Sequence, residues 1–408
     1  MAEKEKLDIC MALHDPQGTY SKYVGITMLS VLDHTKHPVC FHVLMDRTVS
    51  TANQEILLRI ARENGGEVQF YCMDLSDLHY DIAQAARFTI GTLFRLKMME
   101  VLPGSVKRVL YLDADLLVMT DVAEIFSMDD GKHLLAGVLH TADEQAMFAK
   151  KGILHPEQYV NAGVLLWNLK QIRARHINLY QESNVFFEKH PHAGYADQDA
   201  INAIFKDEIL FLPEFLNRQT VLSRQLEERE PHGIYHFRAD VPRENGTYMI
   251  DRLFLSYLKR TPWWTEAFVK AFEARKEARK EAETFVESLI SSKRPIAFFG
   301  AAGVLHRLIM KQFTLSSQDF FVDNNQLLWE TKHMGRPVKN PEILKTYPSG
   351  EIGIIVTIYR YPEIRTQLTS MGFQENVDFC MGKYLLPENV LPLIDGEREN
   401  PWDVVVEA

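Results

Sequence analysis

Short apolar runs that alternate with helical segments are the feature that most constrains how this chain can fold. Residues 7–13, 40–46 and 67–74 have the length and the β-branched or aromatic content of buried strands. Between these runs, residues 20–34 and 55–65 carry apolar side chains at helical spacing, and the second segment ends at a glycine. This strand–helix–strand alternation predicts an α/β domain with a mostly parallel sheet.

Two aspartates interrupt the next apolar run. Val109–Leu112 and Leu116–Met119 flank the sequence Asp113-Ala114-Asp115, and a helix is predicted over residues 91–102 before it. In an extended chain the two carboxylates lie on one face, a few ångströms apart. Buried like charges are costly unless a cation meets them, and hard oxygen ligands favour Mg²⁺ or Mn²⁺. The pattern therefore predicts a divalent metal site, with the alternative that the aspartates cap the next segment.

This arrangement resembles the DxD motif of nucleotide-sugar glycosyltransferases with the GT-A fold. From about residue 7 to residue 264 the chain is similar to glycosyltransferase family 8, which includes the glycogenins and the bacterial lipopolysaccharide galactosyl- and glucosyltransferases. The similarity rests on blocks in the family's order: the DxD run, QYVNAGVLLWNL at 158–169, YADQDAIN at 195–202 and GIYHFRAD at 233–240. It implies a metal-dependent retaining enzyme that transfers glucose or galactose from a UDP-sugar to a glycan, lipopolysaccharide or protein-linked acceptor.

The resemblance also implies a metal-ligand set. Asp113, Asp115 and His236 would hold Mn²⁺ or Mg²⁺, because His236 follows an apolar strand downstream of the acidic motif, although a lone histidine is often structural. In the family this histidine is followed by a glycine and a lysine that grip the diphosphate. Here those positions are Ala239 and Pro242, so the cationic role falls to Arg238 or Arg243.

At the sugar end, the resemblance points to two blocks. Asn161 would hydrogen-bond sugar hydroxyls while Ala162 and Gly163 allow close approach of the ligand; the alternative is a turn before a strand at 164–167. Asp197 would hold sugar hydroxyls, Gln198 would lie beside the reacting face, and Asp199 would be the alternative nucleophile, because an oxocarbenium-like centre needs negative charge nearby. The same carboxylates could simply serve a helix N-terminus, and a front-face mechanism would need no nucleophile.

The rest of the donor site is assigned by resemblance as well. Ala12 and His14 would line the uracil pocket, Tyr20 would stack on the base, and Arg95 would contact the phosphate and the sugar. The complete predicted donor-binding set is Ala12, His14, Tyr20, Arg95, Asp113, Ala114, Asp115, Asn161, Ala162, Gly163, Asp197, Gln198 and Arg243.

A second domain is predicted after residue 264. The catalytic domain would span residues 1–264, an amphipathic connector helix 265–293, a smaller Rossmann-like α/β domain 294–385 and a tail 386–408. The predicted fold class is thus α/β, a GT-A fold joined by a long helix to a Rossmann-like domain.

Two other functions remain open at this point. Gly300-x-x-Gly303 followed by Asp323 resembles an incomplete dinucleotide-binding pattern, so an NAD-dependent sugar-modifying enzyme is one alternative. A non-catalytic sugar-nucleotide or carbohydrate-binding scaffold is the other. The complete metal-ligand set favours the transferase.

Composition limits the partners and the compartment. A net charge of −10 argues against a general nucleic-acid binder. The N-terminus lacks the apolar core of a signal peptide, and no run reaches the length of a membrane span. Four cysteines without zinc spacing are typical of reduced core thiols, so we expect a cytoplasmic protein. A peripheral membrane contact and a homo-oligomer remain open.

Overall fold

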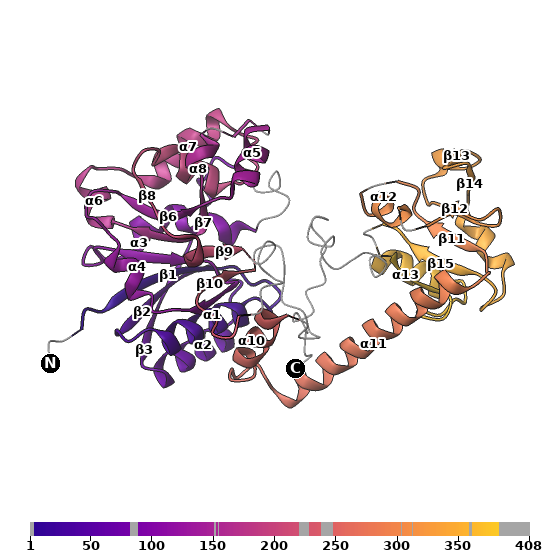
Figure 1. Cartoon of the computed structure of the whole chain (residues 1–408), viewed down its shortest axis with the longest axis horizontal. Coiled ribbons are helices and arrows are strands. Elements are labelled where there is room, and N and C mark those ends of the chain that lie inside the picture. Colours follow the sequence, from indigo (N-terminus) through magenta and orange to yellow (C-terminus); the bar gives the residue numbers. More distant parts are fainter. Residues whose placement is uncertain are drawn as a thin grey trace. The chain divides into compact units, whose positions relative to one another are not determined.

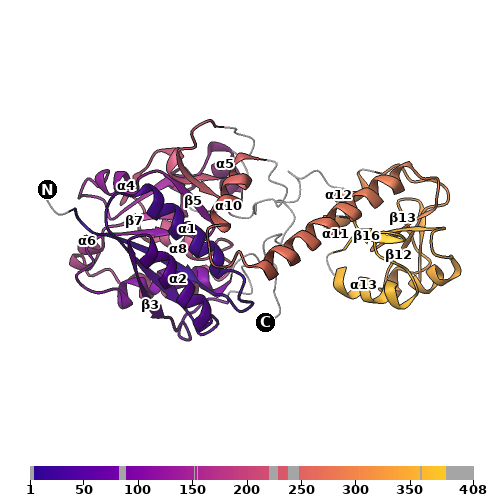
Figure 2. The ribbon, with the colours of Figure 1, turned by 90° about the horizontal axis from the view of Figure 1, so that it is seen from below.

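The computed structural model describes residues 4–81, 89–150, 152–153, 155–219, 228–237, 248–302, 304–311, 313–358 and 361–382. These residues form two compact units, and the boundary in the sequence lies between Ala271 and Phe272. Figures 1 and 2 show both units in two views. Each unit has its own sheets and core, so each is described by itself.

The first unit contains a seven-stranded mixed sheet (Figure 1). Its strands are β1 Leu7–Leu13, β2 Val39–Met45, β3 Gly66–Cys72, β4 Val109–Leu112, β6 Leu135–Leu139, β7 Val160–Trp167 and β8 Ile209–Phe211. They lie in the order β3-β2-β1-β4-β7-β6-β8, with β3 to β4 parallel and β7 antiparallel to both its neighbours. The parallel half confirms the α/β prediction. The carboxyl ends of β1 and β4 meet at one edge, where ligands bind in open α/β sheets.

Helices and turns of the first unit cover this sheet. The α-helices are α1 Ser21–His34, α2 Thr51–Glu63, α3 Met98–Val101, α4 Ala123–Ser127, α5 Ala142–Lys150, α6 Leu169–Ala174, α7 Leu179–Lys189, α8 Asp197–Ile204 and α10 Met249–Leu258. The described residues of this unit also form the 3₁₀ helices η2 Ile90–Lys97, η3 Pro156–Gln158 and η4 Glu214–Asn217. The helix predicted over 91–102 is thus mostly 3₁₀, with one α-helical turn at its end.

One core cluster connects the sheet to the elements that carry the candidate site. Cys10, Leu44 and Trp167 from three strands pack in the same buried cluster as Phe94 of η2 and Phe205, the residue after α8. Burying large aromatic side chains of this kind contributes roughly 2–3 kcal/mol each. The core therefore fixes η2 and α8 relative to the strand ends.

A second, three-stranded sheet consists of β5 Leu116–Met119, β9 Arg218–Gln219 and β10 Gly233–His236, in the order β5-β10-β9. The two apolar runs around the Asp-x-Asp sequence therefore belong to different sheets. The sequence suggested one extended chain, but residues 113–115 instead form the bend between β4 and β5. Because β10 pairs antiparallel with β5, its last residue, His236, lies opposite Leu116 and next to this bend.

The second unit is a three-layer α/β structure. Its strands are β11 Ile296–Phe299, β12 Phe320–Val322, β13 Lys332–His333, β14 Arg336–Lys339, β15 Gly353–Val356 and β16 Phe379–Met381, in the order β13-β14-β12-β11-β15-β16. All pairs are parallel except β13 with β14. Its remaining elements are α11 Glu266–Ser291, which begins in the first unit, α12 Val304–Met310, η5 Gln326–Leu328, η6 Pro341–Thr346 and α13 Tyr361–Ser370.

Two separate cores lie on the two faces of this sheet. Phe285 and Leu289 of α11 pack with Leu305 of α12 in one cluster, and Ile364 and Leu368 of α13 pack in the other. Helices on both faces of a parallel sheet are the doubly wound arrangement that the sequence predicted.

Two further predictions can be compared with the structure. The cysteines are free, and Cys10, Cys40 and Cys380 are buried as expected, but Cys72 at the end of the edge strand β3 is exposed. Among the described helices, none is both long enough and apolar enough to cross a membrane. The predicted tail 386–408, like Arg238, Arg243 and Gly303, lies outside the described residues.

Candidate active site

A cavity of about 530 Å³ opens where the strands of the two sheets in the first unit end. It brings together most of the residues predicted from the sequence: Ala12, His14, Tyr20, Arg95, Asp113, Ala114, Asp115, Asn161, Ala162, Gly163, Asp197, Gln198 and His236. Asp199 is not part of this lining, and Arg243 lies outside the described residues.

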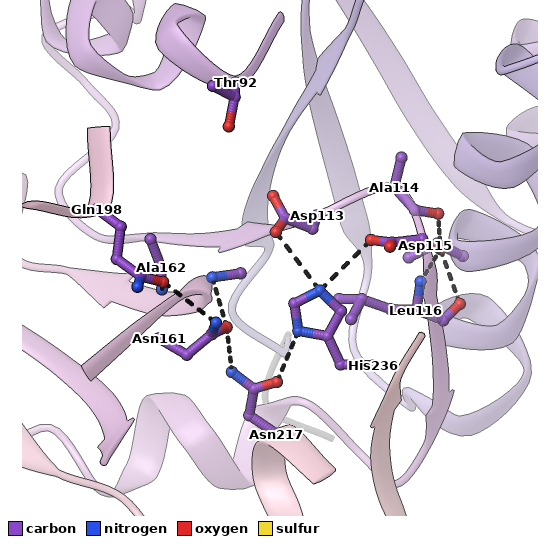
Figure 3. A network of polar contacts seen from close by, with 12 residues as sticks. Thr92, Asp113, Ala114, Asp115, Leu116, Asn161, Ala162, Gln198, Asn217 and His236 are labelled. Carbon is purple, nitrogen blue, oxygen red and sulfur yellow. Dashed lines mark hydrogen bonds and ion pairs between the residues drawn. The ribbon is translucent and has the colours of Figure 1, made fainter. Parts of the chain in front are cut away.

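Three potential metal ligands meet at one end of the cavity (Figure 3). His236 Nε2 lies 3.6 Å from Asp113 Oδ2 and 3.4 Å from Asp115 Oδ1. The ligand atoms of all three residues lie within 4.8 Å of one another. Neighbouring ligands of a hexacoordinate Mg²⁺-sized ion stand about 3 Å apart, so this spacing is close to what a divalent cation needs.

The bend that carries the two aspartates is held from three sides. The Thr27 hydroxyl of α1 donates to the carbonyl oxygens of Ala114, at 2.7 Å, and Leu116, at 2.8 Å. The Asp113 amide donates to the Gly163 carbonyl of β7 over 2.8 Å. The Phe237 amide, directly after β10, donates to the Asp115 carbonyl over 3.0 Å. The backbone geometry that directs both carboxylates toward His236 is therefore set by long-range contacts.

Gly163 keeps the space beside these ligands open. A Cβ atom at this position would lie 2.3 Å from His236 Cε1 and 2.6 Å from Asp113 Oδ2. The glycine predicted to allow close approach of a ligand is thus required by the side chains of the potential metal ligands Asp113 and His236. Two carboxylates and an imidazole fit Mn²⁺ or Mg²⁺ chemically, since the oxygen ligands are hard and the imidazole is borderline.

Arg95 connects the potential metal ligands (below, the metal end of the cavity) to the part of the lining with Ala162 and Asp197 that was predicted to bind the sugar (the sugar end). Its guanidinium is buried, bonds Asp113 Oδ1 at 2.7 Å and the Ala162 carbonyl at 2.5 Å, and lies over the Tyr111 ring at 4.1 Å. Burial alone would lower the pKa of Arg95, but the charges of Asp113 and Asp197 outweigh it and raise this pKa. Arg95 was predicted to contact the donor, and its described contacts hold two acidic residues in place.

Asp197 offers one carboxylate oxygen that lacks a hydrogen bond among the described residues. Its Oδ1 accepts from the Thr92 hydroxyl over 3.1 Å. Its Oδ2 lies 2.9 Å from Arg95 Nε, but that N–H points at the Thr92 carbonyl, so Oδ2 is left without a donor. Burial, opposed by the charge of Arg95, raises the pKa of Asp197 to about 6. A buried acceptor of this kind is suited to a hydroxyl donor from a ligand.

Gln198 and Asn161 face each other across the sugar end. Gln198 Oε1 accepts from the Ala162 amide at 3.0 Å and from Asn161 Nδ2 at 3.2 Å. Asn202, one turn further along α8, bonds both backbone groups of Val160, at 2.8 and 2.9 Å. These contacts tie α8 to β7. Asn161, Ala162 and Gly163 thus lie within β7 and do not form the turn that the sequence left open.

Asp199 points in another direction. Its carboxylate accepts from the Tyr159 hydroxyl and from the Tyr195 amide, the latter at 2.9 Å, and it lines a separate cavity of about 340 Å³. Residues two apart on a helix point about 200° apart, so Asp197 and Asp199 cannot face the same cavity. The sequence analysis placed both residues at the N-terminus of a helix, as the structure does, but it treated them as one block and did not use this helical rotation to separate them.

His14 and Tyr20, which were predicted to bind the base, line the same cavity. His14 Nδ1 lies 2.6 Å from Asp46 Oδ2. Burial opposes ionisation of Asp46, but hydrogen bonds from Thr48 and His14 outweigh it and hold the pKa of Asp46 below its usual value. The Tyr20 side chain is 38% exposed, and its ring centre lies 5.3 Å from that of Tyr23.

Several residues of the site were missed by the sequence reasoning. They are Thr27, Thr92 and Asn217, of which the last accepts from His236 Nδ1 at 3.0 Å. Each has a short polar side chain and lies far from the acidic motif in the sequence, so no motif marks it. Asn217 stands between Leu216 and Arg218, so no local apolar pattern indicates its buried position.

Comparisons with known proteins identify the family and the fold of this chain. The model of glycosyl transferase family 8 matches residues 13–240. A Haemophilus influenzae protein is 26% identical over 201 residues, which span 48% of this chain and only 60% of that relative. The lipopolysaccharide 1,3-galactosyltransferase of Salmonella typhimurium is 22% identical over 259 residues, 59% of this chain and 74% of that enzyme.

Solved structures show the same fold. The galactosyltransferase LgtC, crystallised with donor and acceptor sugar analogs, superposes with a TM-score of 0.53 at 24% identity, covering 64% of this chain and 98% of LgtC. This likeness confirms the predicted GT-A fold of the first unit, and the second unit is an additional α/β region with a sheet of its own. Because the family model spans more than half of its residues, the chain belongs to glycosyltransferase family 8.

Proposed function

We propose that this family 8 glycosyltransferase transfers a hexose, glucose or galactose, from a UDP-sugar to a carbohydrate or glycoconjugate acceptor, with retention of configuration and with bound Mn²⁺ or Mg²⁺. One observation carries the proposal: a single cavity holds a metal-ligand set at one end and sugar-compatible polar groups at the other.

The residues divide the work along this cavity. Asp113, Asp115 and His236 hold the cation, which when bound offsets charge on the departing diphosphate. Asp197, whose Oδ2 lacks a described donor, accepts from sugar hydroxyls. Gln198 presents its amide beside the hexose, with its oxygen already fixed by the Ala162 amide.

The relatives indicate the chemical class of the acceptor, not the individual molecule. The Salmonella typhimurium relative is a lipopolysaccharide galactosyltransferase, so glycan and lipopolysaccharide acceptors are the first to test, followed by protein-linked ones. The chain has no described helix that could span a membrane, so an acceptor in a membrane would be reached from its surface.

Metal-dependent UDP release from a panel of UDP-sugars tests the proposal. Asp115→Asn is the sharper variant, because Asp113 also pairs with Arg95 whereas no described contact joins Asp115 to Arg95. Losing one anionic ligand should reduce Mn²⁺-dependent release about 100-fold or more with UDP-glucose or UDP-galactose. Asp207→Asn, an exposed residue at φ +65° where asparagine is well tolerated, is the matched control.

Three results would contradict the proposal. Full turnover in EDTA, or turnover by Asp115→Asn at the wild-type rate, would show that the reaction does not depend on a bound metal. A product whose anomeric configuration, read by proton NMR, is inverted relative to the donor would exclude retention. Tight binding of UDP-sugars with no release under any condition would identify a sugar-nucleotide-binding scaffold instead.

A further inference from the structure

A chain of hydrogen bonds links His236 to the sugar end of the cavity (Figure 3). His236 Nδ1 lies 3.0 Å from Asn217 Oδ1, and Asn217 Nδ2 donates to Asn161 Oδ1 over 2.9 Å. Asn161 Nδ2 donates to Gln198 Oε1 over 3.2 Å. All four side chains are buried, so each orientation is set by its protein partners.

Backbone amides fix the direction of this chain. The Gly163 N–H donates to Asn161 Oδ1 over 3.0 Å, so the atom at that position must be an oxygen. Asn217 must therefore turn its NH₂ group toward Asn161 and its oxygen toward His236. At the other end, the Ala162 N–H fixes Gln198 Oε1 in the same way.

The orientation of Asn217 determines which ring nitrogen of His236 carries the proton. An amide oxygen only accepts hydrogen bonds, so Nδ1 must donate to it. In the neutral ring Nε2 is then the unprotonated nitrogen, and its lone pair faces Asp113 and Asp115 at 3.6 and 3.4 Å. That is the tautomer required of a metal-binding imidazole.

We infer that Asn217 is a positioning residue that acts through two hydrogen bonds, one to His236 and one to Asn161. Its oxygen holds His236 as the Nδ1–H tautomer so that Nε2 can bind the cation. Its NH₂ group orients Asn161, and through it Gln198. The side chains at the metal end and at the sugar end of the cavity therefore keep a fixed position relative to one another. The inference rests on the proposed function for the role of the cation, whereas the tautomer itself is a property of the metal-free chain.

The tautomer can be read directly in the metal-free wild-type protein. Long-range ¹H–¹⁵N correlation spectra of protein labelled with ¹⁵N-histidine, recorded at about pH 8 where an ordinary imidazole is neutral, distinguish the two ring nitrogens. A His236→Gln spectrum identifies the His236 signals. We expect a protonated Nδ1 and an unprotonated Nε2 in the neutral ring, and a neutral ring with the proton on Nε2 and none on Nδ1 would overturn the inference without any Asn217 variant.

Two substitutions separate the effects of these two hydrogen bonds of Asn217. Asn217→Leu removes both, and it should weaken Mn²⁺ binding about 10–100-fold, measured by water-proton relaxation, and mix the His236 tautomers. Asn217→Asp keeps an acceptor opposite Nδ1 but withdraws the donor from Asn161. It should therefore retain the tautomer and near-wild-type Mn²⁺ affinity while turnover of the donor falls.

Asn168→Ala is the matched control, because Asn168 is also buried and bonds only a helix end, accepting from the Gln171 amide at 3.2 Å. It should lower stability without changing the tautomer or the Mn²⁺ affinity. If Asn217→Leu fails to fold, Asn217→Asp and the wild-type spectra still decide the question.

The outcomes distinguish this inference from the proposed function. If the wild type binds Mn²⁺ and Asn217→Leu binds it equally well, the inference is wrong and the function stands. If the wild type binds no Mn²⁺ yet shows the Nδ1–H tautomer, the metal-dependent function is wrong and only the hydrogen-bond arrangement survives.

Discussion

At the scale of single residues, the ionised carboxylate of Asp197 lowers the stability of the folded protein because it is buried. Its carboxyl is buried among Arg95, Thr92 and the neighbouring charge of Asp113, and burial is the largest influence on its pKa. Its Oδ2 is a buried oxygen without a hydrogen-bond donor among the described residues, and such an oxygen lowers stability. The stability of the metal-free protein should reveal that cost.

Replacing Asp197 with asparagine should stabilise the metal-free protein near pH 7. Its pKa is raised from 3.8 to about 6, so the folded chain binds this proton more tightly than the unfolded chain. Wild-type stability from this group is complete below about pH 4 and is lost as the pH rises to about 6. The advantage of Asp197→Asn over wild type should therefore grow across this range, to at most about 3 kcal/mol.

Urea unfolding in EDTA at pH 4.5 and pH 7.5 measures this difference, with the surface variant Asp207→Asn as control. A constant difference between Asp197→Asn and wild type at both pH values would show that folding does not raise the pKa of Asp197.

At the scale of elements, the close packing of α11 on β15 organises the second unit. Leu289 is fully buried in the core cluster, and a Cβ at Gly353 would lie 2.3 Å from Leu289 Cδ2. The glycine in the strand lets the helix approach so closely that no larger residue fits there without movement. The long helix predicted as a connector is therefore also part of a hydrophobic core.

Leu289→Ala should loosen the second unit selectively. Large-to-small substitution at a site of this kind costs about 2 kcal/mol or more, so amide exchange in β11 and β15 should accelerate roughly 30-fold or more. Ile290→Ala is the matched control, because Ile290 is the next residue in the helix and 59% exposed. Hydrogen exchange followed by mass spectrometry measures both units at once. Equal acceleration in β1 and β4 would show that the two units unfold together.

At the scale of the whole molecule, the boundary between the units lies after Ala271, and the residues just before it pack on the first unit. Trp263 Nε1 donates to Asn53 Oδ1 over 3.0 Å, and its ring lies against Gly25 of α1. Phe268 is buried, with Lys22 Nζ 5.4 Å from its ring centre. The beginning of α11 therefore completes the first unit.

A chain ending at Ala271 should keep UDP binding and slow hydrolysis of the donor, because every described residue of the site precedes that point. A chain ending at Thr261 loses Trp263 and Phe268, so it should be less stable, with exposed apolar surface and lower solubility. Calorimetric titration of UDP in Mn²⁺ compares the two with the full chain. A folded 1–271 chain that fails to bind UDP would show that the second unit completes the donor site.

The sequence by itself determined the fold class and most of the members of the site. Periodicity separated strands from helices over residues 7–74, and the Asp-x-Asp run between apolar segments carried the family resemblance, because local patterns encode these features directly. The pair Asp113 and Asp115 could be recognised from residue types alone, whereas Asn161 and Gly163 were predicted from the family resemblance.

Only the tertiary structure decided which of these residues act together. The helical rotation between Asp197 and Asp199 sends them to different cavities. The pairing of β10 with β5 brings His236 to the acidic bend, and the end of η4 brings Asn217 to His236. These partners come from separate elements, brought together by strand register and core packing. Their contacts are set by distances in space that no spacing in the sequence records.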